Sequence, residues 1–585
     1  MTAARSGPAF SVRDIPFSTY GSWFDISPVV AEKTYAEDLH LVSHQTGMHA
    51  VLRLVPLDAA TGRRAETSVR ATPALLSWAG PAGRVDLAYE SPDTVRLRGS
   101  GLGVGVFAAA RALTPFSGTY FYREPGTAAY VFTSYETGRR YRLTVLSGTV
   151  TETTGAQALG SGDRGVTVGT DGGGVWEVAV EEYETARRPY DLTATFDRVA
   201  DTARAAFAAF TDTVAPWRSP ATPAAELAAY VLWSATVRPK GFVTRSAVLM
   251  SKHWMDKVWS WDHCFNALAL APGQPELAWD QFSLPFDHQD ESGALPDSVT
   301  HSEVLHNFVK PPIHGWALGH LRRRLPTPLS LTQLAEGYDR LSRWTDFWLT
   351  ARRAPGATLP HYQHGNDSGW DNATTFDPER LIVSADLAAF LTLQLHELAH
   401  LAQELGLDGD ARRWRRTAAS TQAAMLNELW SGDRFVARSV NTQDTWSSAS
   451  LLDLMPIALG EHLPEGVSGV LAARIEAHLT PHGLATELPT SPHYLSDGYW
   501  RGPIWAPSTV LVEDGLRRAG HRGLADEISA RFRALCETSG FAENFDALTG
   551  TGLRDRAYTW TAGSYLLLAE AHEHRRAEPV RTAGG

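Results

Sequence analysis

The stretch ADLAAFLTLQLHELAHLAQELG (385–406), followed by ARRWRRTAASTQAAMLNELW (411–430), decides the fold class of the second half of the chain. Apolar side chains recur every three to four residues in both segments, which predicts two amphipathic helices. The intervening LDGD (407–410) is short and polar, so we expect the two helices to form an αα-hairpin.

Similar long segments rich in Ala and Leu extend from about residue 222 to about residue 575. At about 25–30 residues for each helix and its loop, this length predicts on the order of twelve helices. Twelve helices can close as two concentric rings. From the helix count, together with the function argued below, we expect an (α/α)6 toroid over residues 225–578.

The first part of the chain has a different pattern. Runs such as AYVFTSY (129–135), YRLTVLSGTVTET (141–153) and VWEVAVEEY (175–183) alternate apolar and polar side chains and are rich in β-branched and aromatic residues. Such runs are typical of antiparallel strands, and they predict a β-sandwich over residues 1–195. Residues 196–224 then form a helical segment that ends in a Pro-rich break, which we interpret as the linker.

Composition excludes several classes of protein. The chain has 585 residues, of which 43% are hydrophobic and 20% charged, as in soluble globular proteins of about two domains. Its net charge of −12 and the lack of a basic run argue against a nucleic-acid partner. Two distant cysteines, Cys264 and Cys536, indicate neither a disulfide framework nor a Cys-based metal site.

No segment has the apolar character of a signal peptide or a membrane span. We therefore expect a cytoplasmic protein without a membrane partner. The sequence carries no signal for an oligomeric state.

Two carboxylates in aromatic-rich motifs give the first indication of chemistry. Asp371 lies in HGNDSGWDNATTF (364–376) and Glu543 in FAENFD (541–546). An acid and a base on either side of one sugar bond are the minimum equipment of a glycoside hydrolase. Asp367 in the same loop is interpreted as a carboxylate that braces the turn.

The positions of the tryptophan residues in the sequence support a sugar-binding site. Fifteen of the nineteen Trp residues follow residue 222, and five of them lie beside charged or turn residues rather than on an apolar helix face. Flat aromatic faces bind the C–H surface of sugar rings. We therefore expect these five to contribute to binding: Trp259, Trp261, Trp370, Trp500 and Trp505.

Five motifs in one order resemble the catalytic domain of family 63 glycoside hydrolases. They are KVWSWDHCFNALAL (257–270), VKPPIHGWAL (309–318), GNDSGWDNATTF (365–376), DGYWRGPIWAPS (497–508) and ENFD (543–546). The family contains inverting α-glycosidases, is similar in motifs to the trehalases of family 37, and has an (α/α)6 barrel that often follows a β-sandwich. The resemblance covers roughly residues 225–575 and implies an O-glycosyl hydrolase without cofactor or metal.

The resemblance implies that Asp371 is the general acid and Glu543 the general base. We expect burial beside Trp370 to keep Asp371 protonated, whereas Glu543 must stay ionised to activate water. It further implies that Asp262 binds hydroxyls of the sugar in the −1 subsite, although an Asp at this position can also cap the following helix.

The remaining residues of the expected substrate site are given by the same motifs. Lys310 replaces the Gln of many relatives, and because an ammonium group only donates hydrogen bonds, an acidic or modified substrate stays open. His314 is either a contact to the sugar or a buried, hydrogen-bonded histidine. The expected substrate-binding set is Trp259, Trp261, Asp262, Lys310, His314, Trp370, Arg501 and Trp505.

The expected activity is removal of a terminal α-glucosyl residue from an oligosaccharide or small glucoside, with inversion and in exo mode. The alternatives are hydrolysis of α-mannosyl- or glucosylglycerate and a trehalase-like activity. Two remote alternatives are a carbohydrate-binding protein without catalysis and a zinc peptidase. The latter rests on HELAH (396–400), which matches the H-E-x-x-H motif but lacks its extended forms.

Overall fold

The computed structural model describes residues 7–170 and 174–577, which form two compact units. Unit 1 holds the described residues up to Asp212 together with Ala229–Asp256 and Thr300–Ser302, and unit 2 holds Thr213–Ala228, Lys257–Val299 and the described residues from Glu303 on. The expected division into residues 1–195, 196–224 and 225–578 stays a prediction.

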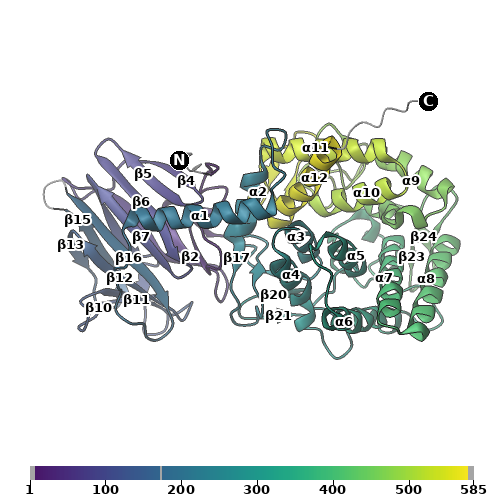
Figure 1. Ribbon diagram of the computed structural model, residues 1–585, viewed down its shortest axis with the longest axis horizontal. Helices are drawn as coiled ribbons and strands as arrows, with labels where there is room; N and C mark the ends of the chain where they lie inside the picture. The colour runs from purple at the N-terminus through teal and green to yellow at the C-terminus, as the bar shows by residue number, and fades with distance from the viewer. Residues whose placement is uncertain (1–6, 171–173, 578–585) are drawn as a thin grey trace. The chain divides into compact units, whose positions relative to one another are not determined.

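Unit 1 contains two antiparallel β-sheets, as the alternating runs predicted (Figure 1). The six-stranded sheet has, in spatial order, β1 (Phe24–Ala31), β2 (Thr34–Ser43), β3 (His49–Asp58), β8 (Leu102–Ala108), β15 (Gly165–Gly169) and β13 (Thr149–Thr154). The eight-stranded sheet has β10 (Thr119–Arg123), β11 (Tyr130–Ser134), β12 (Arg140–Ser147), β16 (Val175–Tyr183), β7 (Thr94–Ser100), β6 (Gly83–Ser91), β5 (Leu75–Gly80) and β4 (Ser68–Thr72).

Apolar side chains from both sheets form one core between them. On β16, the alternate residues Trp176, Val178 and Val180 all belong to this core, as expected for a strand with one buried face. The run predicted over 141–153 is two strands, because Gly148 takes a left-handed conformation (φ 88°) and passes the chain from the eight-stranded to the six-stranded sheet.

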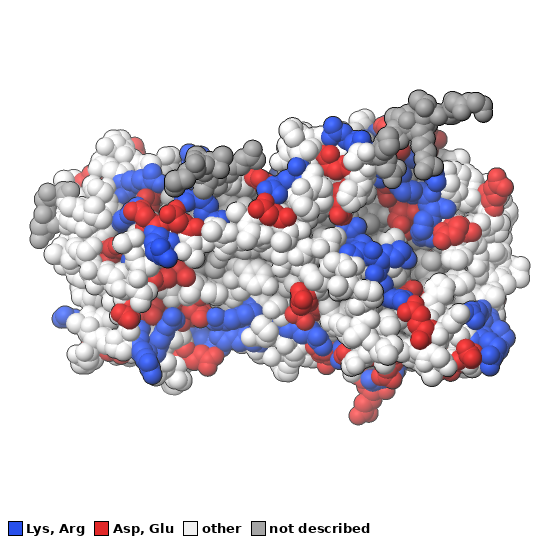
Figure 2. All heavy atoms as spheres, in the orientation of Figure 1, with Lys and Arg blue, Asp and Glu red and all other residues white. Residues whose placement is uncertain are grey.

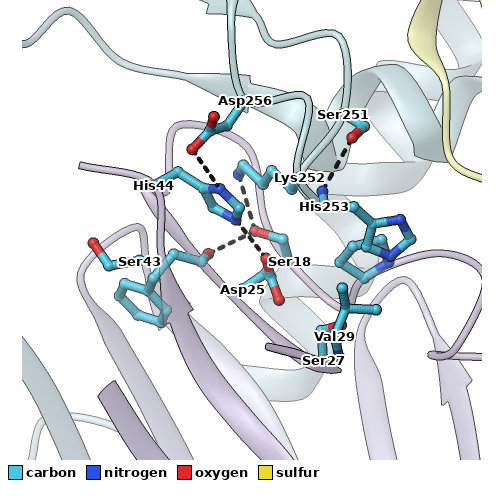
Figure 3. A network of polar contacts seen from close by, with 12 residues as sticks. Ser18, Asp25, Ser27, Val29, Ser43, His44, Ser251, Lys252, His253 and Asp256 are labelled. Atoms are coloured by element: carbon cyan, nitrogen blue, oxygen red, sulfur yellow. Dashed lines mark hydrogen bonds and ion pairs between the residues drawn. The ribbon is translucent and has the colours of Figure 1, made fainter. Parts of the chain in front are cut away.

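A buried polar network lies within unit 1 (Figure 3). His44, directly after β2, lies between two carboxylates: its Nε2 is 2.7 Å from Oδ2 of Asp25, and its Nδ1 is 3.2 Å from Oδ2 of Asp256. The ammonium group of Lys252 donates to the Ser18 hydroxyl at 3.0 Å and to the Ser22 carbonyl at 2.7 Å.

Burial and pairing act in opposite directions on the groups of this network. Burial lowers the pKa of His44, but the hydrogen bonds to Asp25 and Asp256 outweigh it and raise that pKa to about 9. For Lys252 burial is the larger effect and lowers the pKa to about 7, although the negative charge of Asp25 acts to raise it. The imidazolium form of His44 is therefore favoured in the folded protein at neutral pH.

Unit 2 contains a closed ring of six helices, each packed against the next, and the last packs against the first (Figure 1). In order they are α3 (His263–Leu270), α5 (His314–Arg324), α7 (Ala385–Glu404), the 3-10 helix η3 (Leu451–His462), α10 (Ala506–Arg518) and α12 (Thr559–Ala577). Five further helices pack outside this ring: α4 (Pro275–Asp287), α6 (Leu331–Thr350), α8 (Asp408–Leu429), α9 (Glu465–Ala477) and α11 (Arg522–Ser539).

Inner and outer helices alternate along the chain. Each outer helix brings the chain back to the end at which the preceding inner helix began, so the inner helices run in the same direction. The loops that precede the inner helices therefore lie at one end of the ring. The inner helices approach closely where side chains are small; a Cβ on Gly515 of α10 would lie 2.3 Å from the Ile457 carbonyl oxygen of η3.

The hairpin predicted from 385–430 is present as α7 and α8, although α8 begins three residues earlier than expected. Asp408 and Asp410 lie in its first turn, where carboxylates interact favourably with the helix dipole. The (α/α)6 toroid preceded by antiparallel sheets is thus the fold of this chain.

Further helices are α1 (Phe196–Val214), α2 (Ala225–Ala235), η1 (Gly365–Ser368) and η2 (Thr374–Phe376), and short strands include β19 (Val258–Trp259), β20 (Ser298–Val299) and β27 (Asn544–Phe545). Across residues 7–170 and 174–577, no helix is both long enough and apolar enough to cross a lipid bilayer. On the face shown in Figure 2, basic and acidic side chains are interspersed.

Candidate active site

The predicted site residues gather in the loops that precede the inner helices of unit 2. Asp262 directly precedes α3, Lys310 lies before α5, Asp371 before α7, Trp505 before α10 and Glu543 before α12. Because these loops lie at one end of the ring, residues nearly 300 positions apart in sequence reach the same face.

The loop that carries Asp371 is braced by Asp367. Its carboxylate accepts hydrogen bonds from the backbone N–H groups of Val309 (3.1 Å) and Gln363 (2.9 Å), and it pairs with the Arg352 guanidinium at 2.6 Å. This is the bracing role expected from the sequence. A buried carboxylate with three donors fixes the backbone from which Asp371 projects.

Asp371 is half-buried, and its environment favours the protonated form. Burial raises its pKa, and the charge of Asp297 adds to this, whereas the charges of Lys310 and His364 oppose it. The direction is the one expected for a general acid.

Glu543 is 2% exposed, and its backbone N–H donates to the Asp555 carbonyl at 2.8 Å. Burial raises its pKa to about 8, and the charge of Asp555 contributes. The charge of Arg554 acts in the opposite direction. Burial of Glu543 therefore acts against the ionised form that a general base needs.

The pKa of Tyr499 is affected by three carboxylates of the predicted site. Burial raises the pKa of this phenol well above its usual value, and the charges of Glu543, Asp371 and Asp262 raise it further. Sequence reasoning missed Tyr499, although it lies inside the motif DGYWRGPIWAPS (497–508).

Asp262 does not cap α3: its carboxylate makes no capping hydrogen bond to that helix. It is 4% exposed, and its Oδ2 has no hydrogen-bond partner among the described residues. Burial raises its pKa to about 8 despite the opposing charge of Lys310. An unpartnered, buried carboxylate is costly, so it indicates a site prepared for a donor such as a sugar hydroxyl.

Lys310 lies among the carboxylates of the site. Its ammonium group is 2.9 Å from Oδ1 of Asp297 and donates to the Asn366 carbonyl at 3.0 Å. Burial lowers its pKa, but the charges of Asp297 and Asp371 outweigh this and raise it. Lys310 therefore acts as a permanent counter-charge, and Asp297 is a second residue that sequence reasoning missed.

The expected aromatic wall is a stack of buried indoles. Trp500 lies parallel to Trp505 with ring centroids 4.1 Å apart, and Trp370 is 4.6 Å from Trp500 on its other side. These rings and Trp261 are at most 3% exposed, so they mainly support one another. Trp259 at the end of β19 is only half-buried.

His314 and Arg501 contact protein groups rather than an open pocket. His314 is fully buried, its Nε2 lies 2.9 Å from the Ser260 carbonyl, and burial lowers its pKa to about 4. Arg501 donates from Nε to the Asn372 carbonyl at 2.7 Å and forms an ion pair with Asp377. Both residues therefore hold the loops that carry Asp262 and Asp371.

The HELAH segment lies on α7 and its side chains have other partners. Glu397 pairs with Arg322 at 2.8 Å, and the ring of His396 stacks on that of His462 with centroids 4.4 Å apart. In the described part of the chain, no group of three or more His, Cys, Asp or Glu side chains is placed to hold a metal ion. The general base of a zinc peptidase must be free to activate a water molecule, whereas Glu397 is held in the ion pair with Arg322.

Comparison with known proteins gives the family. The family model "Mannosylglycerate hydrolase MGH1-like glycoside hydrolase domain" matches residues 255–561. The mannosylglycerate hydrolase of Rubrobacter radiotolerans is 24% identical over 400 residues, which are 53% of this chain and 89% of that protein.

Two solved structures show the same fold. A family 63 mannosylglycerate hydrolase of Thermus thermophilus, in complex with glucose, matches with a TM-score of 0.53 and 20% identity over 58% of this chain and 98% of its own. A bacterial glucoamylase complexed with acarbose matches with a TM-score of 0.58 and 11% identity over 98% of this chain and 96% of its own. The chain belongs to the mannosylglycerate hydrolase MGH1-like members of glycoside hydrolase family 63 and is an O-glycosyl hydrolase.

Proposed function

We propose that this enzyme hydrolyses the α-glycosidic bond of mannosylglycerate or glucosylglycerate. The observation that carries the proposal is the family match over residues 255–561, which includes the whole set from Trp259 to Glu543. It favours the glycerate alternative over the release of glucose from oligosaccharides, which the sequence first suggested.

In the proposed reaction Asp371 is the general acid. Its protonated carboxyl gives a proton to the glycosidic oxygen while the bond from that oxygen to the anomeric carbon breaks, so glycerate leaves as a neutral alcohol at that position. The raised pKa of Asp371 supports this role because burial favours the protonated carboxyl. Asp371 ends the cycle ionised and regains its proton from solvent.

Glu543 is the proposed general base. Its ionised carboxylate takes a proton from a water molecule whose oxygen attacks the anomeric carbon from the opposite face. The configuration at that carbon is thereby inverted. Since burial raises the pKa of Glu543 to about 8, we expect the pH profile of kcat/KM to have one limb near pH 8 that belongs to this residue.

Asp262 and Trp259 are proposed to hold the sugar in the −1 subsite. The free Oδ2 of Asp262 can accept a hydroxyl hydrogen bond, and in its ionised form this carboxylate stabilises the positive charge that develops on the sugar ring. Trp259 keeps an exposed part of its ring for the C–H face of the sugar. A substrate of one sugar and one glycerate fits the exo mode expected from the sequence.

A substrate panel tests the proposal. Glycerate or glucose release is measured with α-mannosylglycerate, α-glucosylglycerate, maltose and trehalose as substrates. We expect kcat/KM for one of the two glycerate glycosides to exceed that for maltose and trehalose by at least about 100-fold, because a site built for polar groups rejects analogues that lack them. Equal or faster cleavage of maltose would return the assignment to an oligosaccharide α-glucosidase.

A further inference from the structure

Asn372 directly follows the proposed general acid, and its side-chain amide binds the backbone of a different loop. Its Nδ2 donates to the Gly498 carbonyl at 3.0 Å, and its Oδ1 accepts a hydrogen bond from the Trp500 backbone N–H at 3.0 Å. An amide side chain can both donate and accept, so it pairs with two peptide groups at once. Asn372 thereby joins two loops of unit 2 whose bonded residues, Asn372 and Gly498, lie 126 positions apart in sequence.

The backbone between the two bonded peptide groups is strained. Tyr499 lies between Gly498 and Trp500 and has a φ of 64°, in the left-handed region. For a residue other than glycine, such a conformation costs about 1–3 kcal/mol and persists only where the surrounding structure imposes it. The amide of Asn372 binds the peptide groups on both sides of Tyr499, so it stabilises this turn.

Both sequence neighbours of Asp371 contact the same residue, Trp500. On one side, the ring of Trp370 lies 4.6 Å from the ring of Trp500, measured between centroids. On the other side, the amide of Asn372 binds the Trp500 backbone at 3.0 Å. The backbone of Asp371 is therefore held between two contacts to one residue of the opposite loop.

Two further contacts fix the backbone at this position. Nε of Arg501 donates to the Asn372 carbonyl at 2.7 Å, and its guanidinium forms an ion pair with Asp377. Gly365 packs so closely against Asp371 that a Cβ on Gly365 would collide with the Asp371 carbonyl oxygen. Since the carboxyl of Asp371 projects from this backbone, a shift of the loop would move the carboxyl with it.

We propose that Asn372 is a positioning residue for the general acid: its amide holds the backbone of Asp371 against the loop of Trp500 and so fixes where the Asp371 carboxyl meets the glycosidic oxygen. The proposal rests on the role of Asp371 proposed above. Proton transfer requires the carboxyl within hydrogen-bond reach of that oxygen, and a misplacement of about 1 Å can lower the rate about 100-fold.

The test is Asn372→Ala, assayed on two substrates that differ in their need for an acid. The glycerate of α-mannosylglycerate or α-glucosylglycerate must be protonated as it leaves, whereas the fluoride of the corresponding α-glycosyl fluoride leaves as an anion without a proton. We expect kcat for the glycerate glycoside to fall about 10- to 100-fold and kcat for the fluoride to change less than about threefold. Equal losses on both substrates, or no loss on either, would overturn the proposal.

Arg501→Lys is a second variant, and it decides the matter if Asn372→Ala does not fold. Lysine keeps a positive charge beside Asp377 but lacks the Nε group that binds the Asn372 carbonyl. We expect the same selective loss on the glycerate glycoside, smaller in size at about 3- to 10-fold. An equal loss on the glycosyl fluoride would again contradict a role confined to the acid.

Asn441→Ala is the matched control. Its Nδ2 donates to Oε2 of Glu379 at 3.4 Å in another loop of unit 2, and Asn441 is exposed. Removal of this amide should change kcat on either substrate less than about twofold. A selective loss on the glycerate glycoside in Asn441→Ala would contradict the assignment of the effect to Asn372.

Asp371→Asn separates this proposal from the function on which it rests. It should lose hydrolysis of the glycerate glycoside and keep most hydrolysis of the glycosyl fluoride, because only the first reaction needs the acid. If Asp371→Asn loses both activities or neither, the acid assignment fails. If Asp371→Asn shows the selective loss and Asn372→Ala does not, only the positioning role fails.

Discussion

The ammonium group of Lys310 lies 2.9 Å from the Asp297 carboxylate, and both side chains are almost fully buried. The charge of Lys310 also lowers the pKa values of Asp262 and Asp371 against the effect of burial. A single cation therefore sets the electrostatic balance among three carboxylates of the site.

Lys310→Gln tests this balance. Without the cation, the pKa of Asp371 should rise, so the limb of the kcat/KM pH profile that belongs to Asp371 should move to higher pH. The change also leaves Asp297 buried without its partner, which should destabilise the protein by about 3–5 kcal/mol. Lys257→Gln is the control, because Lys257 pairs with the exposed Glu303 at 3.4 Å and should cost less than about 1 kcal/mol. A limb that stays in place in Lys310→Gln would contradict the assigned balance.

Asp262→Asn separates function from stability. We expect kcat/KM to fall about 10- to 100-fold, because a charge-assisted contact to the substrate is lost. Thermal unfolding should shift to higher temperature, since the buried carboxylate lacks a partner for Oδ2 among the described residues.

Asp367→Asn provides the matched comparison for this change. The Asp367 carboxylate has donors from Val309, Gln363 and Arg352, so the same substitution should lower the unfolding temperature there. A lower unfolding temperature in Asp262→Asn would mean that its carboxylate is structurally paired after all.

The His44 network predicts how the stability of unit 1 depends on pH. The pKa of His44 is about 9 in the folded protein, above its ordinary value of 6.5. Its contribution, on the order of 3 kcal/mol, is therefore complete below pH 6.5 and is lost as the pH rises through about 9. Burial of Lys252, whose pKa is lowered to about 7, acts in the opposite direction over a similar range.

The difference between the wild type and His44→Gln isolates the first effect, because Lys252 is present in both. We expect the wild type to unfold at a higher temperature at pH 6, with a difference that shrinks by pH 10. Asp25 and Asp256 are the charged groups that pair with this histidine, and the charges of His253 and Lys252 act on Asp25. A difference in unfolding temperature that stays the same at every pH would show that His44 is not charged in the folded state.

Chelation tests the remote peptidase alternative. Because Glu397 is paired with Arg322 and His396 is stacked on His462, we expect glycoside hydrolysis to change less than about twofold on treatment with a zinc chelator, and in His396→Ala. The assay follows glycerate release before and after dialysis against the chelator. Loss of activity that added zinc restores would point to a metal that this account lacks.

The local pattern of apolar and polar residues predicted the antiparallel sheets and the helical region. The helix pair at 385–430 and the strand at 175–183 could be predicted because apolar residues recur with the period of a helix or of a strand in each element. The break at Gly148 was hidden, since the residues on both sides alternate in the same way and only the sheet to which each strand pairs differs.

The site residues that were predicted lie in the five sequence motifs. Asp371, Glu543 and Asp262 stand in motif positions, whereas Asp297 lies outside the motifs and gains its role from its contact with Lys310. The raised pKa of Glu543 follows from how the loop packs over it. No sequence pattern reports the loss of water around a side chain.

The most direct test of the proposed mechanism is proton NMR of the anomeric signals during hydrolysis of α-mannosylglycerate and α-glucosylglycerate. The account predicts that the β-anomer of the sugar appears first, and that Asp371→Asn and Glu543→Gln abolish its formation while both variants keep the unfolding temperature of the wild type within a few degrees. Initial release of the α-anomer would contradict the roles proposed for Asp371 and Glu543.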